Sequence, residues 1–280
     1  MKLPAAGGES IRKQKVSNIY LMNILKRIAR KLILVYLFPL RFKNSVFHQV
    51  KGIFFLDPTE HLYRTAKHID SKNCMAGAGE KVMIDVGAAF GSVALYFSER
   101  YNDLKIYCVE ANPEVLPKLK EATSDRKNIE LKQMALGSIP GESYLHVTAN
   151  QFSSSLNELD TTEVSHLPQD HQSWLEEVKR VKVQVSTLDA EFKNQSQVLL
   201  LKLDTQGTEL DILKGGVELL KRTRFVLTEL NNHRLYKDAC QYYEVDEFLR
   251  DQSFRLVDLV VTYHTNEEVQ EYDALYENTC

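Results

Sequence analysis

Short apolar runs alternate with helical patterns along the chain beyond Gly79. Six of these runs have the length of a strand, and they fall at residues 82–86, 106–109, 129–133, 181–185, 198–203 and 225–230. Apolar residues at helical spacing follow the first, second and fifth runs. Strands that alternate with helices predict a doubly wound, mostly parallel α/β sheet with helices on both of its faces.

The other segments beyond Gly79 add smaller elements to this plan. Residues 254–263 and 273–276 are predicted to be closing antiparallel strands, and residues 141–147 form a short hairpin arm. The polar, acidic stretch 157–179 is predicted to be an insertion between sheet elements, with a short helix around Trp174.

Two helix boundaries are marked by proline and glycine. Pro113 follows Asn112, a residue type that often caps helices, and is therefore predicted to open a helix. Gly215 and Gly216 interrupt another helical pattern, so we expect that helix to end or kink there.

The first 43 residues form a basic arm on an acidic body. The net charge of the chain is −3, but this arm holds ten Lys and Arg against one acid. Residues 19–37 are predicted to form an amphipathic helix, which either packs on its own domain, the interpretation we favour, or lies on an anionic membrane surface. We therefore divide the chain into a leader with this helix, residues 1–50, and one globular domain, residues 51–280.

The location of the protein is predicted from what interrupts its apolar segments and from its cysteines. Four basic residues break the most apolar part of the arm, so no transmembrane helix is predicted, and no signal peptide is recognised. The four cysteines are far apart and lack the spacing of metal or redox motifs. We expect a cytoplasmic protein, with peripheral membrane contact as the alternative that the basic helix offers.

A glycine turn after the first strand is the first candidate site. Gly87 and Gly91 lie between the run 82–86 and the helical pattern that follows, at the sheet edge where doubly wound folds bind ligands. Glu110 ends the next strand roughly 20 residues later, where a carboxylate accepts hydrogen bonds from the ribose of a nucleoside cofactor. The glycine spacing is not G-x-G-x-x-G, and Asp85 precedes it. An acid there suits the sulfonium and ammonium of S-adenosylmethionine better than the phosphates of NAD.

Seven motifs of the chain resemble those of the FkbM-type S-adenosylmethionine-dependent methyltransferases. In chain order they are "IDVGAAFG", "VEANPE", "ALG", "SSSL", "VSTLD", "LKLDTQGTELDILKGG" and "LTEL", from residue 84 to residue 230. The resemblance implies the Rossmann-like fold of class I methyltransferases and transfer of a methyl group to a hydroxyl of a sugar, glycan or small-molecule metabolite.

The same resemblance implies a set of cofactor-binding residues. Asp85, Gly87 and Gly91 would contact the methionine part of the cofactor, and Glu110 its ribose. The residues that would border the adenine are Gln133, Met134 and Ala135. Asn112 of "VEANPE" belongs to the expected cofactor site, as does Ala88, where family members more often have Asn. The segment between "SSSL" and "VSTLD" is longer than usual for the family and is expected to shape substrate choice.

Asp204 is our first choice for the catalytic residue. It ends the run 198–203 and is expected to point into the cleft beside the cofactor methyl, where it orients or deprotonates the acceptor. Capping of the helix that begins near Glu209 is an equally weighted alternative. Glu209 and Glu229 are candidates to orient the substrate or, as a lesser alternative, to bind a divalent metal together with Asp204. His233 is a second candidate base, although a loop histidine is more often a surface residue.

Two other functions compete with O-methyl transfer. One is a catalytically silent protein of the same fold that binds the cofactor or another ligand, which the intact motif residues oppose. The other is a nucleic-acid methyltransferase recruited by the basic arm. No basic patch with interleaved aromatics continues into the acidic body, and no "NPPY"-like run follows the fourth sheet element. We therefore expect a small-molecule or glycan partner and no specific nucleic acid.

Overall fold

The computed structural model describes residues 59–280 apart from 78, 166–168 and 266–267. The basic arm, its amphipathic helix and the predicted domain boundary at residue 50 lie outside these residues, and so does the expected membrane contact. Within the described part of the chain, no helix combines the length and the apolar character that a bilayer span requires. All four cysteines are free thiols.

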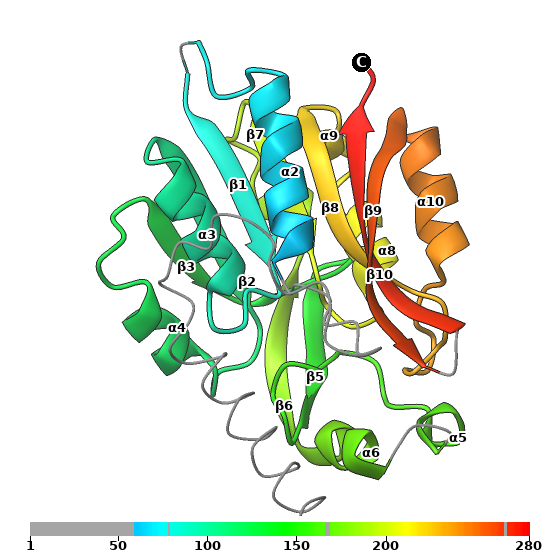
Figure 1. The fold of residues 1–280 in the computed structure, drawn as a ribbon. Helices are drawn as coiled ribbons and strands as arrows, with labels where there is room; N and C mark the ends of the chain where they lie inside the picture. Colours follow the sequence, from blue (N-terminus) through cyan, green and yellow to red (C-terminus); the bar gives the residue numbers. More distant parts are fainter. Residues whose placement is uncertain (1–58, 78, 166–168, 266–267) are drawn as a thin grey trace, which may run out of the picture. The chain divides into compact units, whose positions relative to one another are not determined.

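The fold is built on one seven-stranded sheet with the order β3-β2-β1-β7-β8-β10-β9 (Figure 1). Its strands are β1 (Lys81–Val86), β2 (Leu104–Glu110), β3 (Ile129–Gln133), β7 (Val198–Leu203), β8 (Thr223–Asn231), β9 (Phe254–Thr265) and β10 (Glu268–Asn278). β1, β2, β3, β7 and β8 run parallel, whereas β10 is antiparallel to β8 and to β9. The strand order reverses between β1 and β7, and doubly wound folds bind ligands at such a point. The predicted mostly parallel sheet with a closing antiparallel pair is confirmed.

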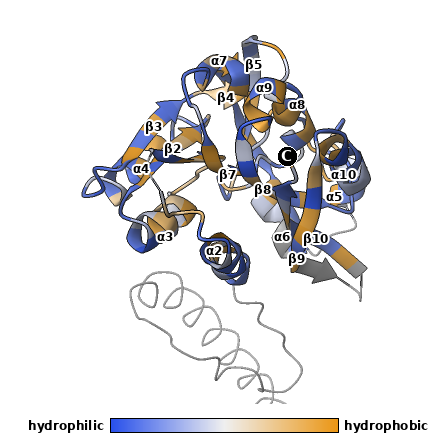
Figure 2. Ribbon diagram, turned by 90° about the horizontal axis from the view of Figure 1, so that it is seen from above, coloured by the Kyte–Doolittle hydropathy of each residue, from blue (hydrophilic) through white to orange (hydrophobic). Residues whose placement is uncertain are grey.

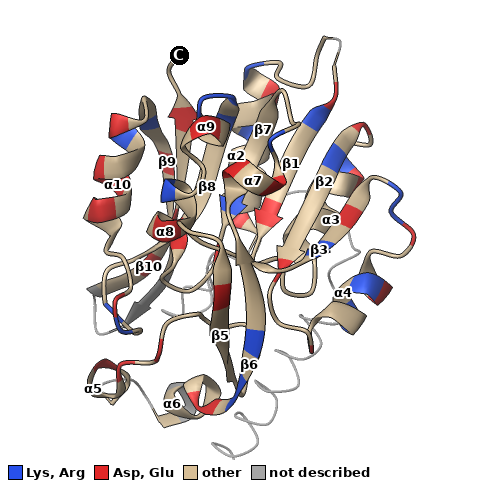
Figure 3. Cartoon of the chain, turned by 180° about the vertical axis from the view of Figure 1, so that it is seen from behind, with Lys and Arg blue, Asp and Glu red and all other residues tan. Residues whose placement is uncertain are grey.

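Helices cover both faces of the sheet (Figure 2). One face packs against α2 (Glu60–Ser71), α3 (Ser92–Arg100) and α4 (Leu116–Ala122). The other face packs against α7 (Leu188–Glu191), α8 (Glu209–Lys214), α9 (Val217–Leu220) and α10 (Tyr242–Asp251). The parallel strands read as continuous apolar runs because both of their faces are buried in this way. Acidic residues occur on α8, α9 and α10 of the second layer (red in Figure 3).

A second, three-stranded sheet has the order β4-β6-β5. Its strands are β4 (Ala135–Leu136), β5 (Gly141–Thr148) and β6 (Glu177–Ser186). The prediction that residues 181–185 form a strand of the main sheet is wrong, because β6 belongs to this second sheet. The segment alternates buried Val183 with exposed Lys182 and Gln184, as a strand does when only one of its faces is covered. The predicted insertion joins β5 to β6 and contains α5 (Thr161–Val164) and α6 (Gln169–Leu175), so the expected helix around Trp174 is confirmed.

The structure confirms one predicted helix boundary and corrects the other. α8 ends at Lys214 and α9 begins at Val217, so the two glycines do separate two helices. Pro113, however, does not open a helix, because α4 begins at Leu116. The Asn112 side-chain oxygen accepts the N–H of Glu114 at 3.1 Å and holds these residues in a turn instead.

Candidate active site

A cleft of about 270 Å³ lies at the carboxyl ends of the parallel strands. Its walls come from the ends of β1, β2, β7 and β8, from the small sheet with the loop after β5, and from β10. Six residues that the sequence predicted to form the site line this cleft: Gly87, Glu110, Met134, Ala135, Asp204 and Glu229. The fold thus brings residues from distant parts of the chain to the predicted sheet edge.

The two glycines of the first turn have different roles. Gly87 lines the cleft with a φ of +74°, and a Cβ at this position would lie 1.9 Å from the carbonyl oxygen of Asp204. Gly91 has a φ of +82° and precedes α3, where a Cβ would lie 2.8 Å from Leu119. Gly91 and the buried Ala88 do not line the cleft. Gly87 therefore belongs to the site, whereas Gly91 permits the packing of α3 against α4.

Glu110 is held at the end of β2 by two backbone N–H groups. Its Oε2 accepts from Ala89 at 2.8 Å and its Oε1 accepts from Asn112 at 2.7 Å. Burial raises the pKa of Glu110, and these two hydrogen bonds oppose that rise. Because a carboxylate oxygen has two lone pairs, each oxygen can still accept a hydrogen bond from a ligand in the cleft. Asn112 does not line the cleft, and its N–H orients Glu110.

The residues that follow β3 supply the apolar side of the same half of the cleft. Met134 and Ala135 line it, and the Met134 N–H donates to the carbonyl oxygen of Glu110 at 3.1 Å. Gln133 ends β3, is exposed and does not line the cleft.

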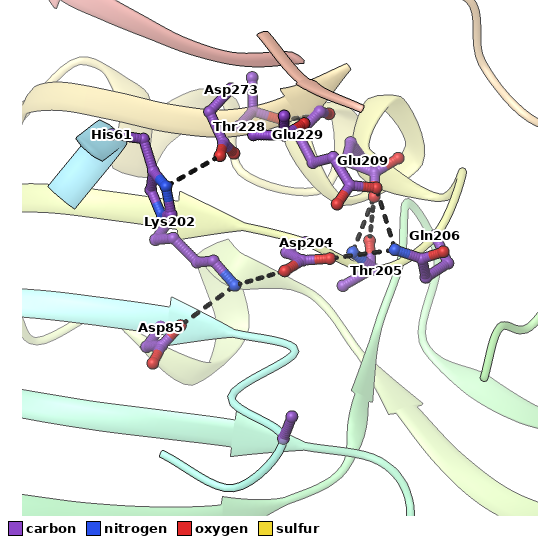
Figure 4. Close-up of polar contacts among 12 residues, drawn as sticks. His61, Asp85, Lys202, Asp204, Thr205, Gln206, Glu209, Thr228, Glu229 and Asp273 are labelled. Atoms are coloured by element: carbon purple, nitrogen blue, oxygen red, sulfur yellow. Dashed lines mark hydrogen bonds and ion pairs between the residues drawn. The ribbon is translucent and has the colours of Figure 1, made fainter. Parts of the chain in front are cut away.

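A row of charges leads from the buried Asp85 and Lys202 to Asp204 in the wall of the cleft. The Lys202 ammonium is 3.1 Å from Asp204 Oδ2 and 3.6 Å from Asp85 Oδ1 (Figure 4). Burial lowers the pKa of Lys202, but Asp204 and Asp85 outweigh it and keep the pKa above its usual value. Asp85 is fully buried and does not line the cleft. Its burial raises its pKa, against the opposing effect of Lys202. Asp85 therefore holds Lys202 in place, and Lys202 in turn holds Asp204.

Asp204 and Glu229 differ in their affinity for a proton. Burial disfavours the charge of Asp204, but Lys202 and hydrogen bonds with Lys202, Gln206 and Glu229 outweigh it, so the pKa of Asp204 is lowered. Burial and the nearby Asp204, Glu271 and Asp273 hold the pKa of Glu229 well above its usual value. The two carboxyls therefore differ in proton affinity, and Glu229 takes up a proton before Asp204 does as the pH falls.

Asp204 does not cap α8, because Thr208 takes the N-cap position. Glu209 is buried and accepts the N–H of Thr205 at 2.8 Å and that of Gly207 at 3.0 Å. These bonds hold the loop after β7 in shape, and Glu209 does not line the cleft. His233 follows β8, is half-buried and does not line the cleft either. Across the described residues, His, Cys, Asp and Glu form no group of three that could hold a metal ion.

The sequence did not single out Gln206 and Glu271, which also line the cleft. Gln206 lies inside the most specific of the resembling motifs, so its position could have suggested a role. Glu271 lies on β10 and reaches the site because β10 pairs with β8, where Asp273 is the register partner of Glu229. A pairing between such distant strands cannot be predicted from a local pattern of residues.

We expect Asp273 to destabilise the folded protein increasingly as the pH rises. Burial and the nearby Asp204 raise its pKa to about 7. A raised pKa means that the folded state binds this proton more tightly than the unfolded chain, so stability is lost as the pH rises from 4 toward 7. Asp273→Asn resembles the protonated form. We therefore expect its free energy of unfolding, relative to the wild type, to increase by about 3 kcal/mol between pH 4 and pH 8.

Urea unfolding of both proteins at the two pH values measures this difference. Asp103→Asn, at an exposed position ahead of β2, is the matched control and should show no comparable increase. An Asp273→Asn effect that is equal at both pH values would mean that Asp273 does not carry a proton in the folded state.

Comparison with known proteins places the chain in a family. The model of the methyltransferase FkbM domain matches residues 85–256. The 2-O-methyltransferase NoeI of Sinorhizobium fredii (strain NBRC 101917 / NGR234) is 25% identical over 183 residues, which cover 64% of this chain and 74% of NoeI.

Two solved structures show a distant likeness. The first is magnesium protoporphyrin IX methyltransferase from Synechocystis PCC 6803, with a TM-score of 0.44, 10% identity and coverage of 91% of this chain and 97% of that one. The second is precorrin-6y C5,15-methyltransferase from Geobacter metallireducens GS-15, with a TM-score of 0.41, 14% identity and coverage of 83% and 93%. Neither likeness bears on the activity of this chain. The match of the domain model covers more than half of the chain, from the end of β1 through β2, β7 and β8, so the chain belongs to the FkbM family of S-adenosylmethionine-dependent methyltransferases.

Proposed function

We propose that this protein transfers the methyl group of S-adenosylmethionine to a hydroxyl of a carbohydrate or small-molecule metabolite, with Asp204 as the proton acceptor. The observation that carries the proposal is the ionised Asp204 carboxylate in the cleft, paired with a buried Lys202. The name of NoeI, a 2-O-methyltransferase, supports oxygen as the acceptor atom.

The half of the cleft beside β1, β2 and β3 fits the cofactor. Glu110 has free lone pairs for the ribose hydroxyls and is already oriented by two N–H groups. Gly87 lines this half of the cleft and lets the turn pack against the Asp204 carbonyl, and Met134 and Ala135 offer an apolar border for the adenine. Carboxyl groups outnumber basic groups along this edge, which suits a cofactor with two cationic centres. When bound, S-adenosylmethionine supplies an electrophilic methyl group.

Asp204 and its neighbours act on the acceptor. A hydroxyl that binds beside Asp204 donates a hydrogen bond to the carboxylate, which aligns its oxygen and takes its proton as that oxygen is methylated. Lys202 keeps Asp204 ionised before the reaction, and its positive charge limits how basic Asp204 becomes. Glu229 lines the same cleft, and its raised pKa favours the protonated form, which donates a hydrogen bond to an acceptor oxygen; this supports a polyhydroxylated acceptor.

Calorimetry with purified protein tests the cofactor, and a panel of neutral sugars and hydroxylated metabolites tests the reaction. We expect binding of both S-adenosylmethionine and S-adenosylhomocysteine, and formation of S-adenosylhomocysteine only in the presence of an accepted hydroxyl compound. Absence of any affinity for either compound would contradict the proposal. Binding of both without turnover of any panel member would favour the catalytically silent alternative.

A further inference from the structure

Gln206 lies in the cleft in an unfavourable backbone conformation. Its φ is +59°, in the left-handed region that residues with a Cβ rarely adopt. Glu209 imposes this conformation, because it accepts the N–H groups of Thr205 and Gly207 on either side. Residues held in such unfavourable backbone conformations are concentrated at functional sites. The side chain of Gln206 is therefore placed where a relaxed backbone would not put it.

The side-chain amide of Gln206 bridges two carboxyl groups. Its Nε2 lies 3.2 Å from Asp204 Oδ1 and 2.9 Å from Glu229 Oε1 (Figure 4). An amide nitrogen carries two hydrogens, so one is available for each carboxyl. The reversed amide would place its oxygen against the ionised Asp204, which fixes the orientation of the group.

The opposite side of Gln206 contacts the loop after β5. The Ser155 hydroxyl donates to the Gln206 carbonyl oxygen at 2.8 Å. The Tyr236 hydroxyl lies 2.6 Å from the Ser153 carbonyl oxygen and 3.3 Å from Gln206 Oε1. Ser153 and Ser155 also line the cleft. Gln206 therefore connects the side of the cleft that carries the two carboxyls to the side formed by these serines.

We propose that Gln206 is a positioning residue, whose side-chain amide holds the Asp204 and Glu229 carboxyls side by side in the acceptor half of the cleft. This inference rests on the proposed function of Asp204. Lys202 occupies Asp204 Oδ2 and Gln206 occupies Oδ1, so the carboxylate is fixed at both oxygens and keeps a lone pair on each for the acceptor hydroxyl. Fixing the base in this way lowers the entropic cost of aligning it with the acceptor.

The variant Gln206→Gly distinguishes a positioning role of Gln206 from a purely structural role in the loop. Glycine adopts a positive φ without strain, so the variant should melt at or above the temperature of the wild type, although it lacks the amide. Loss of the hydrogen bond to a charged carboxylate should raise the proton-binding constant of Asp204 about tenfold. Carbon-13 NMR of the carboxyl groups, with S-adenosylhomocysteine bound, follows this titration. Signals that disappear in Asp204→Asn and Glu229→Gln assign the two groups.

Two further variants complete the test. Ser253→Gly is the matched control, because Ser253 also has a positive φ, of +67°, but lies between α10 and β9 and does not line the cleft. It should leave both titrations unchanged. Gln206→Asn also tolerates a positive φ, and its shorter amide cannot reach both carboxyls, so it should raise the proton affinity of Asp204 as Gln206→Gly does.

The outcomes of this experiment are distinct from those of the proposed function. If the wild type does not bind S-adenosylhomocysteine, the proposed function fails before Gln206 is tested. If the wild type binds it and Gln206→Gly titrates as the wild type does, the positioning role of Gln206 is wrong and that of Asp204 stands. Should Gln206→Gly not fold, Gln206→Asn gives the same decision through the titration of Asp204, because it shortens the amide without adding a charge.

Discussion

Replacement of Asp204 by Asn should lower kcat about a thousandfold, the middle of the range for loss of a general base. Asn has the same shape and still accepts a hydrogen bond, but it cannot take the proton of the acceptor hydroxyl. Lys202 keeps Asp85 as a partner at 3.6 Å, so the buried ammonium is not left without a counter-charge. We therefore expect the variant to fold and to bind S-adenosylhomocysteine with an affinity within threefold of the wild type.

Steady-state rates with an accepted hydroxyl compound, measured as a function of pH, test this prediction. The wild-type rate should fall at acid pH as Asp204 takes up a proton, because its lowered pKa keeps it ionised only above that range. The variant should lack this dependence. Asp211→Asn, an exposed position on α8, is the matched control and should keep the wild-type rate. A kcat for Asp204→Asn within threefold of the wild type would remove Asp204 as the base.

Replacement of Glu110 by Gln should weaken the binding of S-adenosylmethionine about a hundredfold, which corresponds to roughly 2.7 kcal/mol. The carboxylate accepts two backbone N–H groups at once, and an amide offers only one oxygen for them. One N–H donor would then face the NH2 group, and the turn that carries Gly87 would lose one of its bonds. The ribose would also lose an acceptor. Both losses reduce affinity, whereas kcat at saturating cofactor should change much less.

Calorimetry with S-adenosylmethionine and S-adenosylhomocysteine measures the effect of Glu110→Gln. Glu114→Gln is the matched control, because Glu114 belongs to the same motif but is exposed and pairs with Lys179. It should bind both compounds as the wild type does. If Glu110→Gln keeps the wild-type affinity, Glu110 serves only to hold the turn, and the ribose is bound elsewhere.

The turn between β1 and α3 shows how far the sequence could predict the site. Gly87, Glu110 and Asp204 were predicted because each follows a strand that is buried on both faces, and such strands are recognisable as apolar runs. Gly91, Asn112 and Glu209 were predicted from the same motifs, but in the structure they support other parts of the fold. Gly91 permits helix packing, the Asn112 N–H orients Glu110, and Glu209 holds the loop after β7. Their spacing alone could not separate contact with a ligand from support of a residue that makes the contact.

The positions of the β8 and β10 residues in the site could not be predicted from the sequence in this way. Glu229 and Asp273 are register partners on two antiparallel strands, although they are 44 residues apart in the sequence (273 − 229). Gln206 lies in a motif, but its position between two carboxyls and beside the serine loop follows from contacts with β8 and with the loop after β5. Such contacts depend on pairing between distant segments, which local periodicity does not encode.

The amino-acid sequence by itself determined the fold class, the family motifs and the sheet edge at which the cleft lies, because strand burial, glycine turns and helix breaks act over a few neighbouring residues. Only the tertiary structure decided which side chains line the cleft, that β6 leaves the main sheet, and how protons are divided between Asp204 and Glu229. The physical reason is that burial and charge at this edge arise from segments that meet only when the sheet has formed.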